Sequence, residues 1–296
     1  MMMRRFALRA ALVAIPFCVA HAADTPLAQL VDAELSFSKM AGERGIRESF
    51  LHYLADDSVI LAPRPVNGKQ TTGEGPADSG VLSWYPSLVG VSGAGDLGYT
   101  SGPYEYRSAP GAAPVGFGYF ISVWRKEANS EWKVVFDAGV RNVREARAPE
   151  VFGRQQDGRK PAAPLTPTAL ALRERALRQA EMNLQSQVIA QGAKARLAVL
   201  AGDVRFFRDR QQPLSGLQPI AAFLREEPGP RAWKVEKVAL AASGDLGYAY
   251  GMATLPGGVP EERSWMRVWS LEDGGVWKIK LDLELPAPEA KKTESK

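Results

Sequence analysis

Hydrophobic positions along the chain follow a helical period first and a strand period afterwards. Thr25-Pro26 pairs an N-cap residue with a proline at the first helical position. Two helix faces follow, one made of Leu27, Leu30, Val31 and Leu35, the other of Ile46, Phe50, Tyr53 and Leu54. β-Branched and aromatic runs separated by turn residues then predict strands at 59–61, 88–91, 97–107, 118–126 and 132–139.

The second half of the chain repeats this order. Its first helix is predicted from Leu170, Leu177, Ala180, Leu184 and Val188. Its strands are predicted at 204–207, 233–241, 246–255, 263–271 and 276–283. Helices followed by a run of strands predict an α+β fold, in which the helices pack on one face of a mostly antiparallel sheet. A strongly curved sheet of this kind encloses a cavity.

The two halves also share residues at a fixed offset. At 149 residues, Trp84 aligns with Trp233 and the Gly95–Tyr99 stretch with the Gly244–Tyr248 stretch, and at 145 residues Trp124, Trp132 and Asp137 align with Trp269, Trp277 and Asp282. The change of offset falls in a turn-rich insert at 108–114, which lengthens a hairpin without disturbing its strands. The predicted organisation is a tandem duplication: 23–148 as copy one, a Pro-rich linker at 149–168, 169–286 as copy two and a charged tail at 287–296.

Copy one contains four further groups of residues that bear on its family: Leu54-Ala55-Asp56-Asp57-Ser58-Val59, Pro65-Val66-Asn67-Gly68, Ser92 to Tyr99, and Val123-Trp124 with Trp132-Lys133. By these residues, copy one resembles the SnoaL-like branch of the nuclear transport factor 2 superfamily. Copy two keeps the strand motifs and Ala201-Gly202-Asp203-Val204. The resemblance implies two cone-like, cystatin-like α+β domains, each with N-terminal helices on a curved sheet.

The superfamily contains isomerases, dehydratases, cyclases and epoxide hydrolases as well as members without known activity. In relatives that resemble ketosteroid isomerase, a carboxylate general base ends the first strand just before a proline and points into an apolar cavity. Here Ala62 precedes Pro63, and Arg208-Asp209 of copy two lies near the matching place without the proline. The expected base is therefore missing from copy one.

The N-terminal residues have the form of a secretory signal. Arg4, Arg5 and Arg9 precede an apolar run at 10–20, and Ala20-His21-Ala22 is a small-x-small cleavage site, so residues 1–22 are predicted to be removed after Ala22. The expected location is periplasmic or secreted. Because the apolar run is about half of the 20 residues that a membrane-crossing helix needs, no membrane association is expected after cleavage.

Cleavage changes the charge and the available chemistry. Of 37 Lys and Arg, 34 remain against 33 Asp and Glu, and no basic stripe suits nucleic acid. The single cysteine, Cys18, is lost with the signal, and His52 is the one remaining histidine. We therefore predict no metal site, no cofactor and no cysteine nucleophile.

Two short motifs suggest chemistry that their surroundings do not support. Gly93-Ala94-Gly95-Asp96-Leu97-Gly98 matches G-x-G-x-x-G, but a strand follows it where a dinucleotide site needs a helix, so we interpret it as a tight hairpin turn. Ser36-Phe37-Ser38-Lys39 matches S-x-x-K without its companion motifs.

No residue is identified as catalytic, although Asp137 and His52 are considered. His52 falls off the buried helix face, which favours an exposed residue over an acid or base. Asp137 recurs as Asp282, which favours a framework role. A tyrosine-rich set distinguishes copy one and suits a cavity for a mostly apolar ligand, with ordinary core or interdomain packing as the alternative. Its members are Trp84, Tyr85, Tyr104, Tyr106, Tyr119 and Phe120.

Three functions remain open. The favoured hypothesis is an exported, non-catalytic module that binds a small apolar ligand or a protein partner through copy one. The first alternative is a cofactor-independent lyase, isomerase or hydrolase that uses a tyrosine such as Tyr104 and a carboxylate such as Asp137 in the copy-one cavity. The second is a structural pseudo-dimer, in which the copies pair with each other and the chain is a monomer.

Overall fold

The computed structural model describes residues 25–75, 78–142, 155–227, 229, 232–255 and 261–287. Both the predicted signal at 1–22 and nearly all of the predicted tail lie outside these residues. In the described part of the chain, no helix combines the length and the apolar character needed to cross a membrane.

The N-terminal domain begins with helices and continues with strands, as expected. Its elements are α1 (Pro26–Arg44), α2 (Ile46–Tyr53), β1 (Leu54–Leu61), β2 (Pro65–Asn67), α3 (Gly68–Glu74), β3 (Val81–Trp84), β4 (Leu88–Val91), β5 (Leu97–Arg107), β6 (Pro114–Lys126), β7 (Trp132–Asn142) and β8 (Gln155–Gly158). The sheet order is β2-β1-β7-β6-β5-β4-β8, with β3 also paired to β5.

The C-terminal domain repeats this plan with fewer strands. Its elements are α4 (Pro167–Gln191), α5 (Ala193–Ala198), β9 (Leu200–Arg208), β10 (Leu214–Ser215), α6 (Leu217–Glu226), β11 (Ala232–Leu240), β12 (Leu246–Leu255), β13 (Glu261–Glu272) and β14 (Val276–Pro286). The sheet order is β10-β9-β14-β13-β12-β11. β1 runs parallel to β7 and β9 runs parallel to β14, and the long strands are otherwise antiparallel. The expected fold, two tandem α+β domains with helices on mostly antiparallel sheets, is confirmed.

Local sequence signals account for several element ends. The Thr25 hydroxyl accepts a hydrogen bond from the Ala28 N–H at 3.2 Å and caps α1, with Pro26 at the first helical position. Gly45, at φ 91°, ends α1 in a conformation that costs glycine little. Between β4 and β5, Gly95 has φ 71° and the Ser92 hydroxyl bonds Asp96 at 3.0 Å, so the G-x-G-x-x-G stretch is a hairpin turn.

Two segments differ from the sequence-based expectation. Leu54, expected on the second helix, begins β1 because it pairs with Val134 on β7. The stretch expected to be a linker contains β8, which adds to the edge of the first sheet by pairing in parallel with β4. It also contains the start of α4, which Thr166 caps by accepting from the Ala169 N–H at 3.3 Å.

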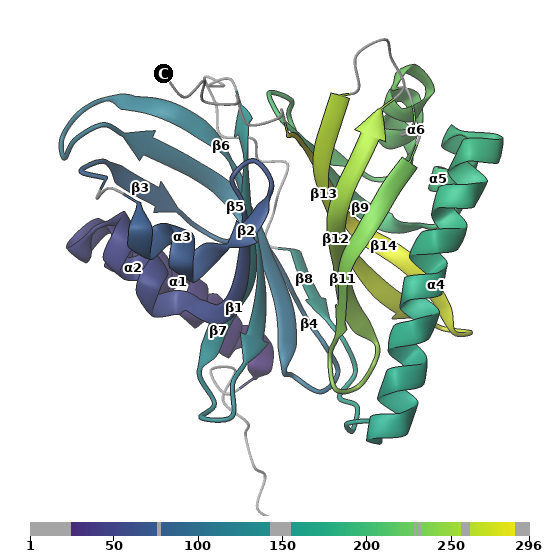
Figure 1. Ribbon diagram of the computed structural model, residues 1–296. Helices are drawn as coiled ribbons and strands as arrows, with labels where there is room; N and C mark the ends of the chain where they lie inside the picture. The colour runs from purple at the N-terminus through teal and green to yellow at the C-terminus, as the bar shows by residue number, and fades with distance from the viewer. Residues whose placement is uncertain are drawn as a thin grey trace, which may run out of the picture.

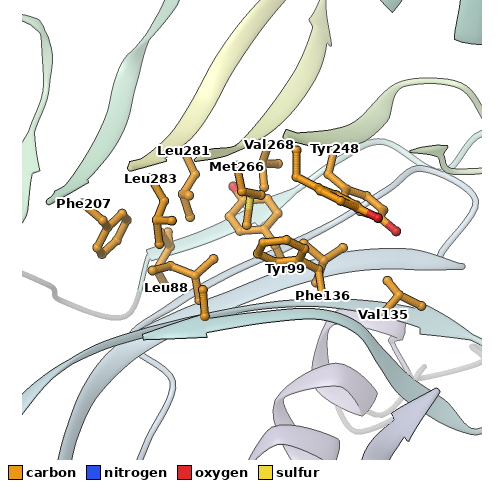
Figure 2. Close-up of a cluster of buried hydrophobic side chains, with 14 of the residues drawn as sticks. Leu88, Tyr99, Val135, Phe136, Phe207, Tyr248, Met266, Val268, Leu281 and Leu283 are labelled. Carbon is orange, nitrogen blue, oxygen red and sulfur yellow. The ribbon is translucent and has the colours of Figure 1, made fainter. Parts of the chain in front are cut away.

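The two sheets face each other, and the helices of each domain cover the outer faces (Figure 1). A buried apolar cluster fills the space between the sheets and draws on both domains (Figure 2). From the N-terminal domain it includes Tyr99, Tyr119, Ile121, Val123 and Phe136, and from the C-terminal domain Phe207, Tyr248, Met266, Leu281 and Leu283. Two further clusters lie between each sheet and its own helices.

The equivalent turns of the two domains also bind each other. Asp96 accepts from the Ala242 N–H at 2.8 Å, and Asp245 accepts from the Gly93 N–H at 3.0 Å. Each aspartate at a hairpin bend therefore satisfies a backbone donor in the other copy, which fixes how the two sheets meet.

Candidate functional site

The N-terminal domain holds a cavity of about 720 Å³ between α1, α2 and the helix-covered face of its sheet. This volume lies in the range of small-molecule sites. The walls are mostly aromatic and aliphatic, with few polar groups. They are formed by Phe37, Phe50, Leu82, Trp84, Tyr104, Tyr106, Val115, Gly116, Phe117, Phe120, Ser122, Asp137, Ala138, Gly139, Arg141 and Asn142.

Glycines on β6 lie directly beneath the two tyrosines of this wall. A Cβ at Gly118 would overlap the Val140 carbonyl oxygen and lie 2.6 Å from the Tyr104 ring. One at Gly116 would lie 3.3 Å from the Tyr106 Cβ. Glycine at position 118 therefore lets the Tyr104 ring lie against β6 and lets β6 approach β7 closely. At Gly139 a Cβ would meet the Tyr104 ring only at an ordinary 3.5 Å. Because Gly139 has no side chain, the space above β7 at this position remains part of the cavity.

Asp137 places an acidic group in this apolar wall. It accepts a hydrogen bond from the Ser122 hydroxyl at 2.7 Å, across the β6–β7 pair. Burial raises the pKa of Asp137 to about 7; the Ser122 hydrogen bond opposes the rise and the nearby Glu34 adds to it. Both protonation states are therefore populated near neutral pH.

A second buried acid, Glu34 on α1, stands behind the wall. It is fully buried and accepts from Trp84 Nε1 at 2.5 Å, Thr100 Oγ1 at 2.6 Å and Trp124 Nε1 at 2.9 Å. Burial raises the pKa of Glu34, and these three donors partly offset the rise. Both carboxylate oxygens of Glu34 accept hydrogen bonds from buried side chains. Its bond to Trp84 Nε1 holds the indole of Trp84 in the cavity wall.

Four of the six aromatic residues predicted to bind ligand line the cavity, namely Trp84, Tyr104, Tyr106 and Phe120. Tyr85 is half exposed and borders a smaller neighbouring pocket of about 330 Å³. Tyr119 is buried on the other face of β6, its ring 6.4 Å from that of Phe207 in the C-terminal domain. Successive residues of a strand point to opposite faces, so Tyr119 cannot share the cavity with Phe120.

His52 is exposed at the end of α2 and does not line the cavity. In the S-x-x-K stretch, Ser38 donates to the Trp84 carbonyl at 2.7 Å and Phe37 packs in the core, so the motif belongs to helix packing. Asp137, expected as a framework residue, is instead part of the cavity wall. Within the described ranges, no three His, Cys, Asp or Glu side chains gather as a metal site would require.

Sequence reasoning missed several wall residues. Phe37 and Phe50 come from the two helices and meet Trp84 edge to face, with ring centroids 4.9 and 6.4 Å away. Ser122 and Arg141 lie on β6 and β7, and the sequence pattern did not show which face of these strands borders the cavity. The alternation of Gly116, Gly118 and Phe120 along one strand was the available signal.

In the C-terminal domain the equivalent space is filled with charged side chains. The sheet register sets the equivalence, because Ser122 pairs with Asp137 on β6 and β7 as Arg267 pairs with Asp282 on β13 and β14. By the same register Glu284 replaces Gly139. Arg267 and Glu284 are buried, so long charged groups lie where the N-terminal domain has small ones.

These charges balance one another. Arg267 bonds Asp282 and Glu181 at 2.8 and 2.7 Å, while Arg196 bonds Glu284 at 2.8 Å. Arg208 pairs with Asp282 at 2.8 Å. Burial alone would raise the pKa of Asp282, but Arg208, Arg196 and Arg267 outweigh burial and hold it below the ordinary value. This ion cluster occupies what is open space in the N-terminal domain.

The position where the resemblance expects a base also differs between the copies. Ile60 pairs with Asp137 and Phe206 pairs with Asp282, which makes Ala62 and Arg208 equivalent. The N-terminal domain therefore has a methyl group there and the C-terminal domain a guanidinium. The acid of the open cavity comes instead from the last strand, at Asp137.

Comparisons with solved structures concern one domain at a time. A nuclear transport factor 2-like protein of unknown function from Pseudomonas putida is 19% identical, covers 42% of this chain and 93% of its own, and has a TM-score of 0.35. A nuclear transport factor 2-like protein with a cystatin-like fold from Novosphingobium aromaticivorans is 15% identical over 43% and 93%, with a TM-score of 0.32. A ketosteroid isomerase-like protein from Erwinia carotovora is 13% identical over 41% and 94%, with a TM-score of 0.31. No protein-family model and no curated protein matches the sequence.

The chain's own elements define its class. Each half has the helix-first order and the curved, mostly antiparallel sheet that the resemblance to nuclear transport factor 2-like domains implies. The molecule is a tandem of two cystatin-like α+β domains, with an open cavity in the first and an ion cluster in the second.

Proposed function

We propose that the N-terminal domain binds a small, mostly apolar molecule in its cavity. The observation that carries the proposal is the contrast between the copies. The same architecture surrounds about 720 Å³ lined by aromatic rings in one domain and a charge-filled core in the other. Open apolar space costs packing energy, since its lining atoms lack contacts. A ligand bound in the open space of the N-terminal domain would restore the contacts that its lining atoms lack.

Within the cavity, Ser122 and Asp137 supply a polar point that orients the ligand. They hydrogen-bond each other and lie among apolar walls, where a correctly placed donor or acceptor on the ligand has high value. The ligand of this proposal is therefore apolar over most of its surface, and Ser122 and Asp137 can hydrogen-bond a polar group that it carries at their end of the cavity.

The test uses N-phenyl-1-naphthylamine, a neutral probe whose fluorescence rises in apolar surroundings. The wild-type protein is expected to bind it in a saturable way. Gly139→Leu should lower the affinity at least about tenfold, because its side chain would enter the open space next to Tyr104.

Gly42→Leu is the matched control, since Gly42 lies exposed on α1 with open space around it. It should bind the probe like the wild type. Absence of saturable binding, or equal binding by the Gly139 and Gly42 variants, would reject the proposal. Native mass spectrometry of protein purified from its natural compartment adds a search for a co-purifying molecule.

A second candidate function is a cofactor-independent lyase, isomerase or hydrolase reaction in the same cavity. Asp137 favours it, because an acid with a pKa of about 7 inside an apolar site is suited to general acid–base work. Its hydrogen-bond partner is Ser122 rather than a tyrosine. Turnover of a bound molecule that Asp137→Asn abolishes would establish this reaction over binding alone.

The proposal includes export of the chain. It rests on Arg4, Arg5 and Arg9, the apolar run and the Ala20-His21-Ala22 cleavage site. Sequencing the N-terminus of the mature protein tests it, with Ala23 as the expected first residue.

A further inference from the structure

A row of three residues crosses the sheet at one end of the cavity. Tyr104 on β5 pairs with Gly118 on β6, and Gly118 pairs with Arg141 on β7. Adjacent strands lie about 4.8 Å apart, so Tyr104 and Arg141 flank a glycine that leaves the space between them open. The Tyr104 ring reaches across Gly118 toward β7, and its hydroxyl would lie 4.0 Å from a Cβ at Gly139. The equivalent row in the C-terminal domain is Ala253, Arg263 and Pro286.

The C-terminal domain holds Arg141 in place. Asp209, just past the end of β9, accepts from the Arg141 backbone N–H at 3.0 Å, from Nε at 3.3 Å and from Nη2 at 2.8 Å. The next residue, Arg210, donates its backbone N–H to the Arg141 carbonyl at 2.7 Å. The Arg141 side chain stays two-thirds exposed while held in this way. Its position is therefore set before any ligand arrives.

Arg141 keeps donors to offer. A guanidinium carries five N–H groups, and Asp209 engages the two nitrogens Nε and Nη2. The Nη1 group of Arg141, which Asp209 does not engage, leaves charged N–H donors for a ligand at this end of the cavity. Among the described residues that line the cavity, Arg141 is the one cation.

The other polar groups of the wall show which side chain can bind a ligand together with Arg141. Tyr106 donates its hydroxyl to Asp78 at 2.9 Å, so it is already engaged. The Tyr104 hydroxyl has no hydrogen-bond partner among the described residues, and Arg141 lies close enough for its charge to lower the pKa of Tyr104 against the rise that burial causes. A carboxylate can accept hydrogen bonds from both Tyr104 and Arg141, and unlike a neutral carbonyl group it also pairs with the Arg141 charge.

Asp137 disfavours that anion at the opposite end of the cavity when Asp137 is ionised. Asp137, Gly139 and Arg141 alternate along β7 and share the cavity face, so about 14 Å separates Asp137 from Arg141 at 3.4 Å per residue. A carboxylate beside ionised Asp137 would face a second negative charge in an apolar site, which is unfavourable. At Arg141 it meets a positive charge. Gly139, which lies between Asp137 and Arg141, leaves open space in which the apolar part of a ligand can lie along β7.

We propose that the ligand is a hydrophobic carboxylic acid, bound with its carboxylate at Arg141 and Tyr104 and its apolar body extending along β7 toward Asp137. This inference rests on the proposed ligand-binding function. It makes Arg141 a specificity residue of the N-terminal cavity that is positioned by a residue of the C-terminal domain.

The experiment compares decanoate with decanamide as competitors of N-phenyl-1-naphthylamine, at a pH where the acid is ionised. The wild type should bind decanoate about fivefold more tightly than the amide, the upper end of what a partly exposed ion pair supplies. Arg141→Met should bring the ratio of the two affinities to about one. Tyr104→Phe should lower the ratio in part. Added salt should also reduce it.

Two variants serve as matched controls. Arg210→Met removes a neighbouring charge whose side chain is three-quarters exposed, and Tyr106→Phe removes a hydroxyl already bound to Asp78. Both should keep the wild-type ratio. If the probe binds and both competitors displace it equally well from the wild type, the carboxylate inference is overturned. If the probe does not bind at all, the failure lies with the proposed function.

Discussion

At the residue scale, the two copies show how neighbours alone decide the behaviour of one side chain. Asp137 and Asp282 occupy the same place on the last strand of their sheets. Burial raises the pKa of Asp137 to about 7, because a single serine hydroxyl cannot compensate for lost water. Asp282 is fully buried, yet three arginines hold its pKa below the ordinary value. The first remains able to exchange a proton near neutral pH, and the second is a fixed negative charge.

The raised pKa of Asp137 makes a prediction about stability. The folded protein holds this proton up to about pH 7 and the unfolded chain loses it near the ordinary value of 3.8, so unfolding releases a proton between these limits. The free energy of unfolding should therefore fall as pH rises from 4.5 to 7, by up to about 1.4 kcal/mol per pH unit from this group. Asp137→Asn should make that fall smaller, and Glu34 and Glu181, whose pKa values burial also raises, should account for the rest. Urea unfolding followed by tryptophan fluorescence across this range measures the fall.

Asp32→Asn, at an exposed position on α1, is the control and should follow the wild-type curve. Asp282 does not interfere, because a carboxyl with a lowered pKa contributes its stability fully above the unfolded value and loses it only at lower pH. Parallel pH curves for the wild type and Asp137→Asn would show that Asp137 is not buried as described.

At the element scale, the parts of the fold that depend on local signals were predictable from the sequence. Alternation bounded by turn residues gave β4, β5 and β12 with the observed ends, and Thr25-Pro26 gave the start of α1. The hairpin turn at Gly95 was predictable because a strand, and not a helix, follows the G-x-G-x-x-G stretch. In each case the physical cause lies within a few residues of the element itself.

The remaining parts depend on partners that are distant in sequence. β8 forms because the edge of β4 is available to pair with it, and nothing in its own polar sequence announces a strand. The face on which Tyr119 lies depends on strand register and on the C-terminal sheet packed against it. The acid at Asp137 became a site residue only through the small residues around it. Comparison of the two copies identifies the residues that maintain their common fold. The candidate site depends on the positions at which the copies differ, which such a comparison does not explain.

The ion cluster of the C-terminal domain ties α4, α5, β9, β13 and β14 together, and its integrity can be tested. Arg267→Met would leave the buried Glu181 without its cation and would remove one of the three arginines around Asp282. Removing one partner of such a network costs about 3–5 kcal/mol. Arg125→Met, which breaks a surface pair with Asp57, should cost less than about 1 kcal/mol. Urea unfolding monitored by circular dichroism compares the two, and equal costs would mean that the cluster is not buried from solvent.

At the scale of the whole molecule, duplication has produced two unequal domains that depend on each other. Their sheets bury a common apolar cluster, and the hairpin aspartates Asp96 and Asp245 each satisfy the other copy's backbone. Asp209 extends this dependence to the candidate site, because it holds Arg141 at the cavity of the other domain. The charge-filled domain therefore supports the open one. Space for a ligand in one copy is compatible with a stable chain when the other copy supplies a well-packed partner.

This arrangement predicts a monomer in solution. The sheet faces that two separate domains would use to dimerise are already buried against each other within one chain, so these faces are not available to a second copy. Light scattering should return the mass of one chain across a wide concentration range. Small-angle scattering should give a radius of gyration of about 19 Å, the value for a compact body of this length, whereas domains held apart by a linker would give a larger one. A stable dimer as the dominant species, or an extended two-body profile, would contradict the pairing of the two sheets.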